Sequence, residues 1–406
     1  MIKSVPAADL RLGMFLHKLG GSWMKHPFLR SSFLLTDAND IKRIQQAGIK
    51  EVWIDDEKGD GISATHPEPK IENLEAENTA IEEILESEES SQKEKNTVPM
   101  EVAVERARKL CNEAKGQVQV MFKDARLGKS IDTNASESLV SEIEMLIDSN
   151  SAAMLSVARI KTHDDYTYMH SVAVCALMLS LAKQLNLDEK QTKLAGVGGL
   201  MHDLGKVFMP INVLNKPGKL TDAEYDVMKK HPAVGAKVLQ NGEAASEIID
   251  IALHHHEKVD GSGYPQGLKQ DDISVLARMG AICDVYDAVT SNRPYKDAWD
   301  PAISIRKMAS WQGHFDKNIF SAFVKSLGIY PVGSLVRLSS QRLAVVIEPG
   351  EESLLTPKVK VFFSLRSKEQ ITTQTIDLAT LGCKETIEGP EDPENWNFKN
   401  FDSFWQ

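Results

Sequence analysis

Cysteine is scarce in this 406-residue chain, and its four cysteines are widely separated. No two of them form a C-x-x-C pair, which argues against a disulfide framework and against a zinc ribbon. Long apolar runs are missing too: the longest, around residues 171–182, ends at Lys183 and is shorter than the roughly 20 residues that a membrane span needs. No apolar core of a signal peptide follows Met1. We therefore expect a cytoplasmic protein without a membrane span.

Positive charge is not in excess either, since the formal net charge is −11 at pH 7. Much of this charge lies between residues 64 and 98, where ten Glu, three Lys and no Asp give a formal charge of −7. The rest of the chain is nearly balanced, so the overall acidity says little about the charge of a cleft elsewhere. A nucleic acid polymer is not an expected partner.

The patterning divides the chain into five parts, and the expected fold class is mainly α. Residues 1–62 alternate short apolar runs with turn residues and predict a small α+β module. Residues 63–99 predict an acidic, solvated linker with a helical stretch around Ile81–Leu85. Further on, residues 100–150 predict connecting helices, 151–330 a helical-bundle domain, and 331–406 a small β appendage with an aromatic tail.

Histidine is unevenly distributed: seven of the eleven fall between His163 and His256. Any one of them alone could be a buried, hydrogen-bonded and inert side chain. The adjacent pair His202-Asp203 is costly to bury in an apolar helix unless something compensates its charge. A divalent metal would do so, because imidazole nitrogen and carboxylate oxygen are both metal ligands. The other histidines and Asp284 lie on further predicted helices, as expected when a bundle directs ligands into its core.

Three motifs resemble those of the HD-GYP family: HDLGK at 202–206, HHEKVDGSGYP at 255–265 and DVYDAVTSNRPYK at 284–296. This family is a branch of the HD-domain metal-dependent phosphohydrolases that degrades the bacterial second messenger cyclic di-GMP. The resemblance covers roughly residues 151–327 and implies an HD-type helical bundle. The first 62 residues resemble the small domain often found ahead of it.

The resemblance implies two divalent cations, with iron and manganese the first candidates and zinc, nickel and magnesium also compatible. A third cation is not expected, because Tyr166 stands where some members carry a glutamate ligand. The H-H-E pattern of the family aligns with His255-His256-Glu257, which leaves His254 as a packing or supporting residue. The implied metal ligands are His170, His202, Asp203, His231, His255, His256 and Asp284.

The implied reaction is hydrolysis of cyclic di-GMP to linear pGpG by a hydroxide shared between two metals, and whether GMP follows is open. The catalytic roles fall to Lys206, Asp203 and Asp287. The implied substrate contacts are Lys206, Tyr264, Arg293 and Lys296, with Gly261 and Gly263 shaping the loop that carries Tyr264.

Two alternatives remain from the sequence. The same metals could hydrolyse another cyclic dinucleotide, or the chain could be a catalytically weak cyclic di-GMP sensor or adaptor. A homo-oligomer or a signalling-protein partner is compatible with either.

Overall fold

The computed structural model describes residues 98–405 with gaps at 130–132, 162–165, 217–219, 292–297, 351–352, 397 and 399–403. Ahead of residue 98 it describes only short stretches and single positions between 2 and 84. The chain forms two compact units, Met1–Glu75 and Ala76–Gln406. Among the described residues, no helix combines the length and the apolar character that crossing a bilayer requires.

The first unit contains an antiparallel four-stranded sheet with the strand order β1-β4-β2-β3. Its strands are β1 (Ile2–Pro6), β2 (Phe15–Leu19), β3 (Phe33–Leu34) and β4 (Glu51–Asp55). Val5, Leu16, Val52 and Ile54 lie in its buried core, as the alternation of apolar residues along the strands requires. The short apolar runs 14–16, 33–35 and 51–54, which predict strands, correspond to β2, β3 and β4.

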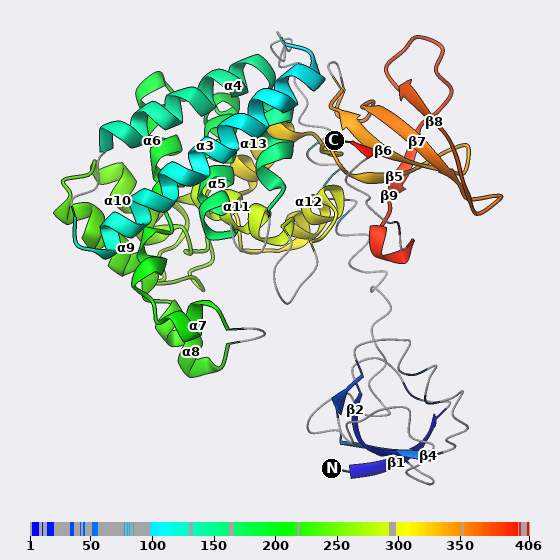
Figure 1. The fold of residues 1–406 in the computed structure, drawn as a ribbon, viewed down its shortest axis with the longest axis horizontal. Coiled ribbons are helices and arrows are strands. Elements are labelled where there is room, and N and C mark those ends of the chain that lie inside the picture. Colours follow the sequence, from blue (N-terminus) through cyan, green and yellow to red (C-terminus); the bar gives the residue numbers. More distant parts are fainter. Residues whose placement is uncertain are drawn as a thin grey trace. The chain divides into compact units, whose positions relative to one another are not determined.

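The second unit is mainly helical, which confirms the predicted fold class (Figure 1). Two long helical segments come first, α3 (Met100–Arg126) and α4 (Thr133–Arg159), and pack against each other. α4 is kinked at Asn150, whose backbone is not helical. They are followed by α5 (Tyr166–Gln184), α6 (Glu189–Met201), η3 (Leu204–Phe208), α7 (Ile211–Leu214), α8 (Asp222–Met228), α9 (His231–Asn241), α10 (Ser246–His254), η4 (Gln270–Asp272), α11 (Val275–Val289), α12 (Pro301–Ser310) and α13 (Lys317–Leu327).

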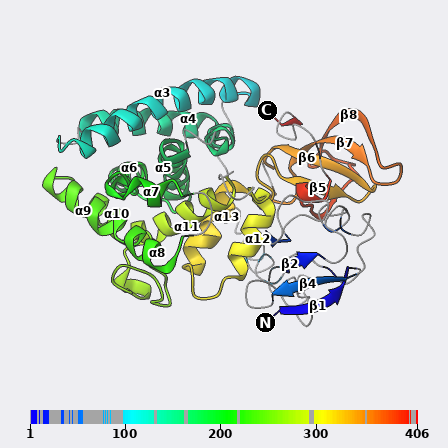
Figure 2. The ribbon, with the colours of Figure 1, turned by 60° about the horizontal axis from the view of Figure 1, so that its bottom comes forward.

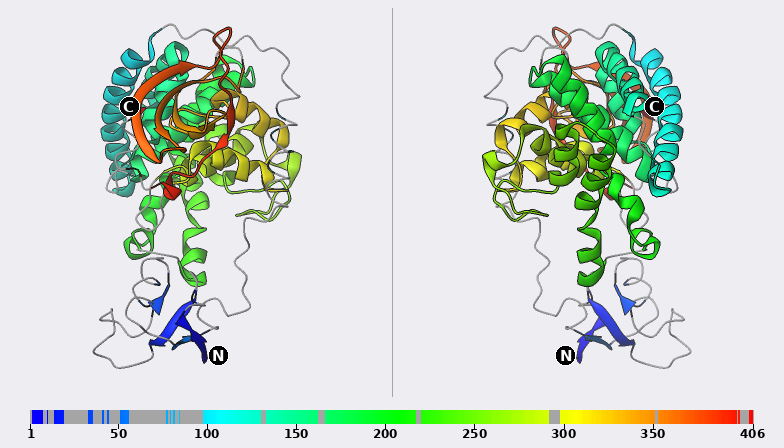
Figure 3. Two further views of the ribbon diagram at one scale, coloured as in Figure 1. Left: turned by 90° about the vertical axis from the view of Figure 1, so that its right-hand side faces the viewer. Right: turned by 90° about the vertical axis from the view of Figure 1, so that its left-hand side faces the viewer.

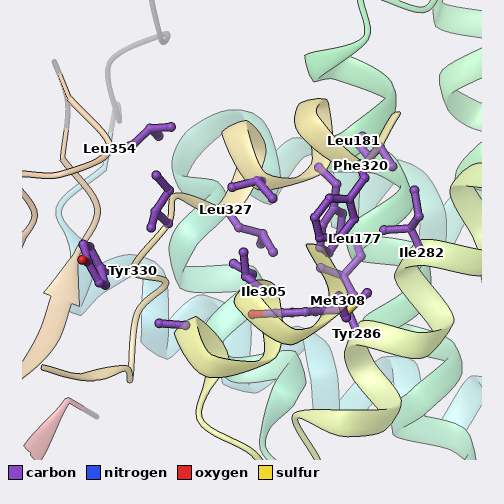
Figure 4. Close-up of a cluster of buried hydrophobic side chains, with 14 of the residues drawn as sticks. Leu177, Leu181, Ile282, Tyr286, Ile305, Met308, Phe320, Leu327, Tyr330 and Leu354 are labelled. Carbon is purple, nitrogen blue, oxygen red and sulfur yellow. The ribbon is translucent and has the colours of Figure 1, made fainter. Parts of the chain in front are cut away.

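Helix α5 forms the centre of the unit. Every residue from Met169 to Ala182 is buried, so this apolar run is a core helix. One side of α5 packs in a cluster with α11, α12 and α13, and the other side in a cluster with α3, α4 and α6. Leu177 and Leu181 of α5 contribute to the first cluster, shown close up in Figure 4.

Local capping signals in the sequence also hold. Residues 221–224 have the S/T-x-x-E pattern that predicts a capping box, and Thr221 and Glu224 form one at the start of α8, where the Thr221 backbone N–H donates to Glu224 Oε2 at 2.7 Å. His231 begins α9, with Pro232 inside its first turn as the sequence predicts.

The predicted β appendage is an antiparallel sheet with the order β8-β7-β6-β5-β9, at one end of the helices (Figure 3). Its strands are β5 (Leu335–Leu338), β6 (Arg342–Glu348), β7 (Lys358–Ser364), β8 (Glu369–Asp377) and β9 (Ile387–Pro390), with η5 (Pro393–Asn395) after them. Val336 and Leu338 share a core cluster with the helices, while Leu335 packs with Trp405 of the aromatic tail. The sheet is therefore continuous with the helical core.

Candidate metal centre

The seven predicted metal ligands lie on or beside five helices, α5, α6, α9, α10 and α11 (Figure 2). Each ligand stands at a helix end, just beyond one, or inside a buried helix. His170 lies on α5, His202 and Asp203 follow α6, His231 begins α9, His255 and His256 follow α10, and Asp284 lies on α11.

The histidines form two groups. In the first, His202 Nε2 lies 3.2 Å from His170 Nε2, and His170 Nε2 lies 3.0 Å from Asp284 Oδ1. In the second, His231 Nε2 lies 3.3 Å from His255 Nε2, and the His255 and His256 ring centroids are 4.1 Å apart. Two nitrogens that each lie about 2.1 Å from one ion are roughly 3 to 3.4 Å apart, so these spacings suit one cation per group.

Asp203 stands between the two groups and faces each with a different oxygen. Its Oδ2 lies 3.4 Å from both His170 Nε2 and His202 Nε2. Its Oδ1 lies 3.3 Å from His231 Nε2 and 3.8 Å from His255 Nε2. A carboxylate with one oxygen toward each of two ligand groups has the geometry needed to bridge two cations.

The orientation of the imidazole rings shows that lone pairs point into the centre. His231 Nδ1 lies 2.7 Å from the Met228 carbonyl, and His255 Nδ1 lies 3.0 Å from the Ala252 carbonyl. A carbonyl only accepts, so each Nδ1 carries the proton and donates it. In the neutral rings both Nε2 atoms are therefore acceptors, and they converge on Asp203 Oδ1, a buried acceptor with no hydrogen-bond partner. A cation bound between these three acceptors would be attracted to all of them, so the residues fit a metal.

His202 and His170 are held in the same way. His202 Nδ1 lies 2.7 Å from the Gly199 carbonyl, and His170 Nδ1 lies 2.6 Å from Asp287 Oδ2. Hydrogen bonds of this kind fix the tautomer and the ring orientation of metal-binding histidines. Asp287 thus supports a predicted ligand.

The electrostatics of the centre differ between its two groups of histidines. Burial lowers the pKa of His255 well below its ordinary value and that of His256 to about 3, so both rings are neutral at pH 7. Burial alone would also lower the pKa of His170, but hydrogen bonds to Asp203, Asp284 and Asp287 raise it to about 10. For Asp203 and Asp284 burial opposes ionisation, yet their cationic and histidine neighbours hold both pKa values well below the ordinary range. The metal-free centre therefore keeps a positive charge among its carboxylates.

The centre opens toward solvent on the side of His256 and Lys206. These side chains are 20% and 23% exposed, whereas the other six predicted ligands are almost fully buried. The Lys206 ammonium pairs with Asp203 Oδ2 at the edge of the centre. Gly205 lets η3 approach α9 closely, since a Cβ at this position would overlap the His231 backbone carbonyl.

The glycine-rich loop covers the same side. Glu257 is buried and its carboxylate accepts three backbone N–H groups, from Gln266 at 2.7 Å and from Gly267 and Leu268 at 3.1 Å. The Tyr264 ring lies 4.7 Å from that of His256, centroid to centroid. This places a predicted substrate contact beside a predicted ligand.

Two glycines give the loop its shape. Gly261 has a φ of +83°, in the left-handed region that favours glycine. At Gly263, a Cβ would overlap the backbone of Glu257 and Lys258. Both glycines are therefore required by the path of the backbone.

His254, the first of the three consecutive histidines, faces away from the other two. Its Nδ1 lies 2.7 Å from Asp250 Oδ1, and Ser274 Oγ donates to the other oxygen of the same carboxylate. Ser274 also caps α11. His254 thus helps to join α10 to α11, in the supporting role expected from the sequence.

Tyr166 lies parallel to the His170 ring, with their centroids 5.8 Å apart. Arg293 and Lys296, two predicted phosphate contacts, lie outside the described residues, as does His163.

Sequence reasoning missed Lys161, whose ammonium pairs with Asp287. It also missed the bond between Asp250 and Ser274. A lysine between two helices carries no local signal of burial, because its partner is 126 residues away.

Comparisons with known proteins complete the description of the site. The family described as "Domain of unknown function (DUF3391)" matches residues 2–136, and the family described as "HD domain" matches residues 142–319. The cyclic di-GMP phosphodiesterase PA4108 of Pseudomonas aeruginosa is 49% identical over 407 residues, which cover all of this chain and 96% of that protein.

Two further relatives match a smaller part of the chain. The cyclic di-GMP phosphodiesterase response regulator RpfG of Xanthomonas campestris is 40% identical over 148 residues, 36% of this chain and 39% of that protein. The 3'3'-cGAMP-specific phosphodiesterase 1 of Vibrio cholerae is 35% identical over 178 residues, 43% of this chain and 41% of that protein.

Proposed function

The chain belongs to the HD-GYP family of HD-domain proteins, and on this premise we propose that it is a metal-dependent phosphodiesterase that hydrolyses cyclic di-GMP. The observation that carries the proposal is the convergence of His231 Nε2, His255 Nε2 and Asp203 Oδ1, with the Nδ1 atom of each ring bonded to a backbone carbonyl. A full-length relative with 49% identity bears the same activity in its name.

We propose that His170, His202 and Asp284 hold one divalent cation, that His231, His255 and His256 hold a second, and that Asp203 joins both. When bound, two such cations would activate water and neutralise charge on the phosphate. The donor set of imidazole and carboxylate suits iron or manganese first, with zinc, nickel and magnesium also compatible.

The remaining residues bind and orient the substrate. Lys206 stands at the open edge of the centre, where its ammonium can leave Asp203 for a phosphate oxygen. Tyr264 forms the wall beside His256, and burial, with the nearby Tyr225, raises the pKa of its hydroxyl, which therefore stays protonated and able to donate. Arg293 and Lys296 are proposed as further phosphate contacts, because Arg binds phosphate bidentately.

The test is hydrolysis by purified protein that has been loaded anaerobically with iron or manganese. We expect cyclic di-GMP to be consumed at neutral pH with linear pGpG as the first product, and chelator-treated protein to be inactive. A parallel assay with 3'3'-cGAMP examines the second candidate, which the 35% identical relative motivates. Cyclic di-GMP left intact by metal-loaded protein would reject the proposal, and faster turnover of 3'3'-cGAMP would replace the substrate.

A further inference from the structure

Lys161 lies in the connection between α4 and α5, and its side chain is fully buried. The ammonium pairs with both carboxylate oxygens of Asp287 on α11 and lies 2.8 Å from Ser291 Oγ. It also lies 5.7 Å from the centroid of the Tyr166 ring. A buried ammonium is costly to desolvate, so its place is set by these partners.

Asp287 connects Lys161 to the metal centre. Its Oδ2 lies 2.6 Å from His170 Nδ1, and the opposite nitrogen of that ring, Nε2, lies 3.0 Å from Asp284 Oδ1. The order of contacts is Lys161, Asp287, His170 and then the first ligand group. No other lysine or arginine among the described residues pairs with Asp287.

We propose that Lys161 is a positioning residue that acts on His170 through Asp287. This inference rests on the proposed metal centre. A carboxylate bound at both oxygens by one ammonium cannot rotate freely about its Cβ–Cγ bond. Its Oδ2 therefore stays directed at His170 Nδ1, and His170 Nε2 stays directed at the first ligand group. Mutation of outer partners of metal ligands typically lowers metal affinity or activity by about 10- to 100-fold.

The same ammonium also fixes the end of α11. Ser291 lies two residues beyond the end of this helix and precedes residues 292–297, which include the predicted phosphate contacts Arg293 and Lys296. Lys161 thus contacts both Asp287, which holds the ligand His170, and Ser291, which precedes the residues proposed to bind phosphate.

The first test compares K161M with the matched control K183M. Methionine has a similar length without charge. Lys183, at the end of α5, forms ion pairs with Glu144 and Asp148 of α4. We expect folded K161M to bind one of its two cations about 10- to 100-fold more weakly in competition with a chromophoric chelator, while K183M binds both like the wild type. Wild-type affinity for both cations in K161M would overturn the inference.

A double variant separates positioning from stability. K161M/D287L replaces the buried ion pair with two apolar side chains, an exchange that often restores stability. We expect this variant to fold and still to bind one cation weakly, because His170 has lost its acceptor. If K161M does not fold and the double variant binds both cations like the wild type, the pair serves stability alone and the inference is overturned.

These measurements are independent of the proposed function. Metal affinity is read without substrate, so a wild-type protein that binds two cations but leaves cyclic di-GMP intact would reject the function and not the role of Lys161. If the wild-type protein hydrolyses cyclic di-GMP and K161M binds both cations with wild-type affinity, only the role of Lys161 would be rejected.

Discussion

Asp203 is the residue on which the two ligand groups depend, because each of its two oxygens faces two histidines of one group. We predict that Asp203→Ala loses both cations and at least about 10²-fold of the hydrolytic activity, while the helical fold persists. Metal content of the purified variant and its circular dichroism spectrum check this. A variant with wild-type metal content would show that the bridge is not needed.

Lys206 differs from Asp203 in its role, because it contacts Asp203 but is not a predicted metal ligand. Lys206→Ala should keep both cations and hydrolyse cyclic di-GMP about 10²-fold more slowly, because one charge that stabilises the phosphate is lost. Steady-state kinetics with parallel metal analysis is the measurement. An unchanged rate would remove Lys206 from the mechanism.

At this scale the sequence identifies candidate ligands better than their supports. The adjacent His202-Asp203 pair and the clustered histidines already indicate a metal, and the resemblance to a known family assigned the seven positions. Lys161 could not be found in this way, because only the folded chain brings it to Asp287, 126 residues further on. The supports of a site are fixed by tertiary contacts that no local pattern records.

Among the elements, the contact between η3 and α9 carries the second ligand group. A Cβ on Gly205 would overlap the His231 backbone, so Gly205→Ala should lower the free energy of unfolding by about 1–3 kcal/mol and weaken metal binding. Chemical denaturation and metal analysis test this.

Gly116→Ala is the matched control for that substitution. Gly116 lies within α3, with open space where the added methyl group would stand, so alanine there should stabilise the helix by about 0.5–1 kcal/mol. Equal destabilisation of both variants would show that backbone approach at Gly205 is not the cause.

The elements that the sequence did not predict are short strands. In the appendage, the apolar runs 334–338, 343–347, 359–363 and 372–376 predict strands and correspond to β5, β6, β7 and β8. The apolar residues of β5, β6 and β7 are largely buried, whereas β8 is mostly exposed. β9 contains a glycine and a proline and is ordered by pairing with β5, while β1 is ordered by pairing with β4. Strand formation there depends on the partner more than on local propensity.

For the whole molecule, stability should depend on pH through His314. Its ring stacks on Phe315 at 4.2 Å, and burial, together with the nearby charge of Lys258, lowers its pKa to about 4, while Asp260 acts in the opposite sense. A histidine with a lowered pKa in the folded state contributes stability above its ordinary pKa of about 6.5 and loses it as the pH falls toward 4.

His314→Phe retains the stacking and removes the titration. Between pH 6.5 and 4, the free energy of unfolding of the wild type should therefore fall more steeply than that of the variant. Urea denaturation at several pH values measures both slopes. Parallel slopes would exclude a contribution from His314.

At the same scale, the mainly helical fold with its β appendage was predicted from the change of periodicity along the chain. The shared core of the helices and the appendage was not predicted, because it depends on tertiary contacts. One of them is the hydrogen bond that the Leu335 backbone N–H donates to Asp300 Oδ2 at 2.8 Å. Tyr330 and Leu354 lie in one apolar cluster with Leu177 and Leu181 (Figure 4). The appendage therefore completes the core of the helical unit.

The central claim is that this core holds two cations, one on each side of Asp203. Anomalous diffraction at the absorption edge of the bound metal, from crystals of iron- or manganese-loaded protein, tests it most directly. The account predicts two peaks, one among His170, His202 and Asp284 and the other among His231, His255 and His256. A single peak, or peaks away from Asp203, would contradict it.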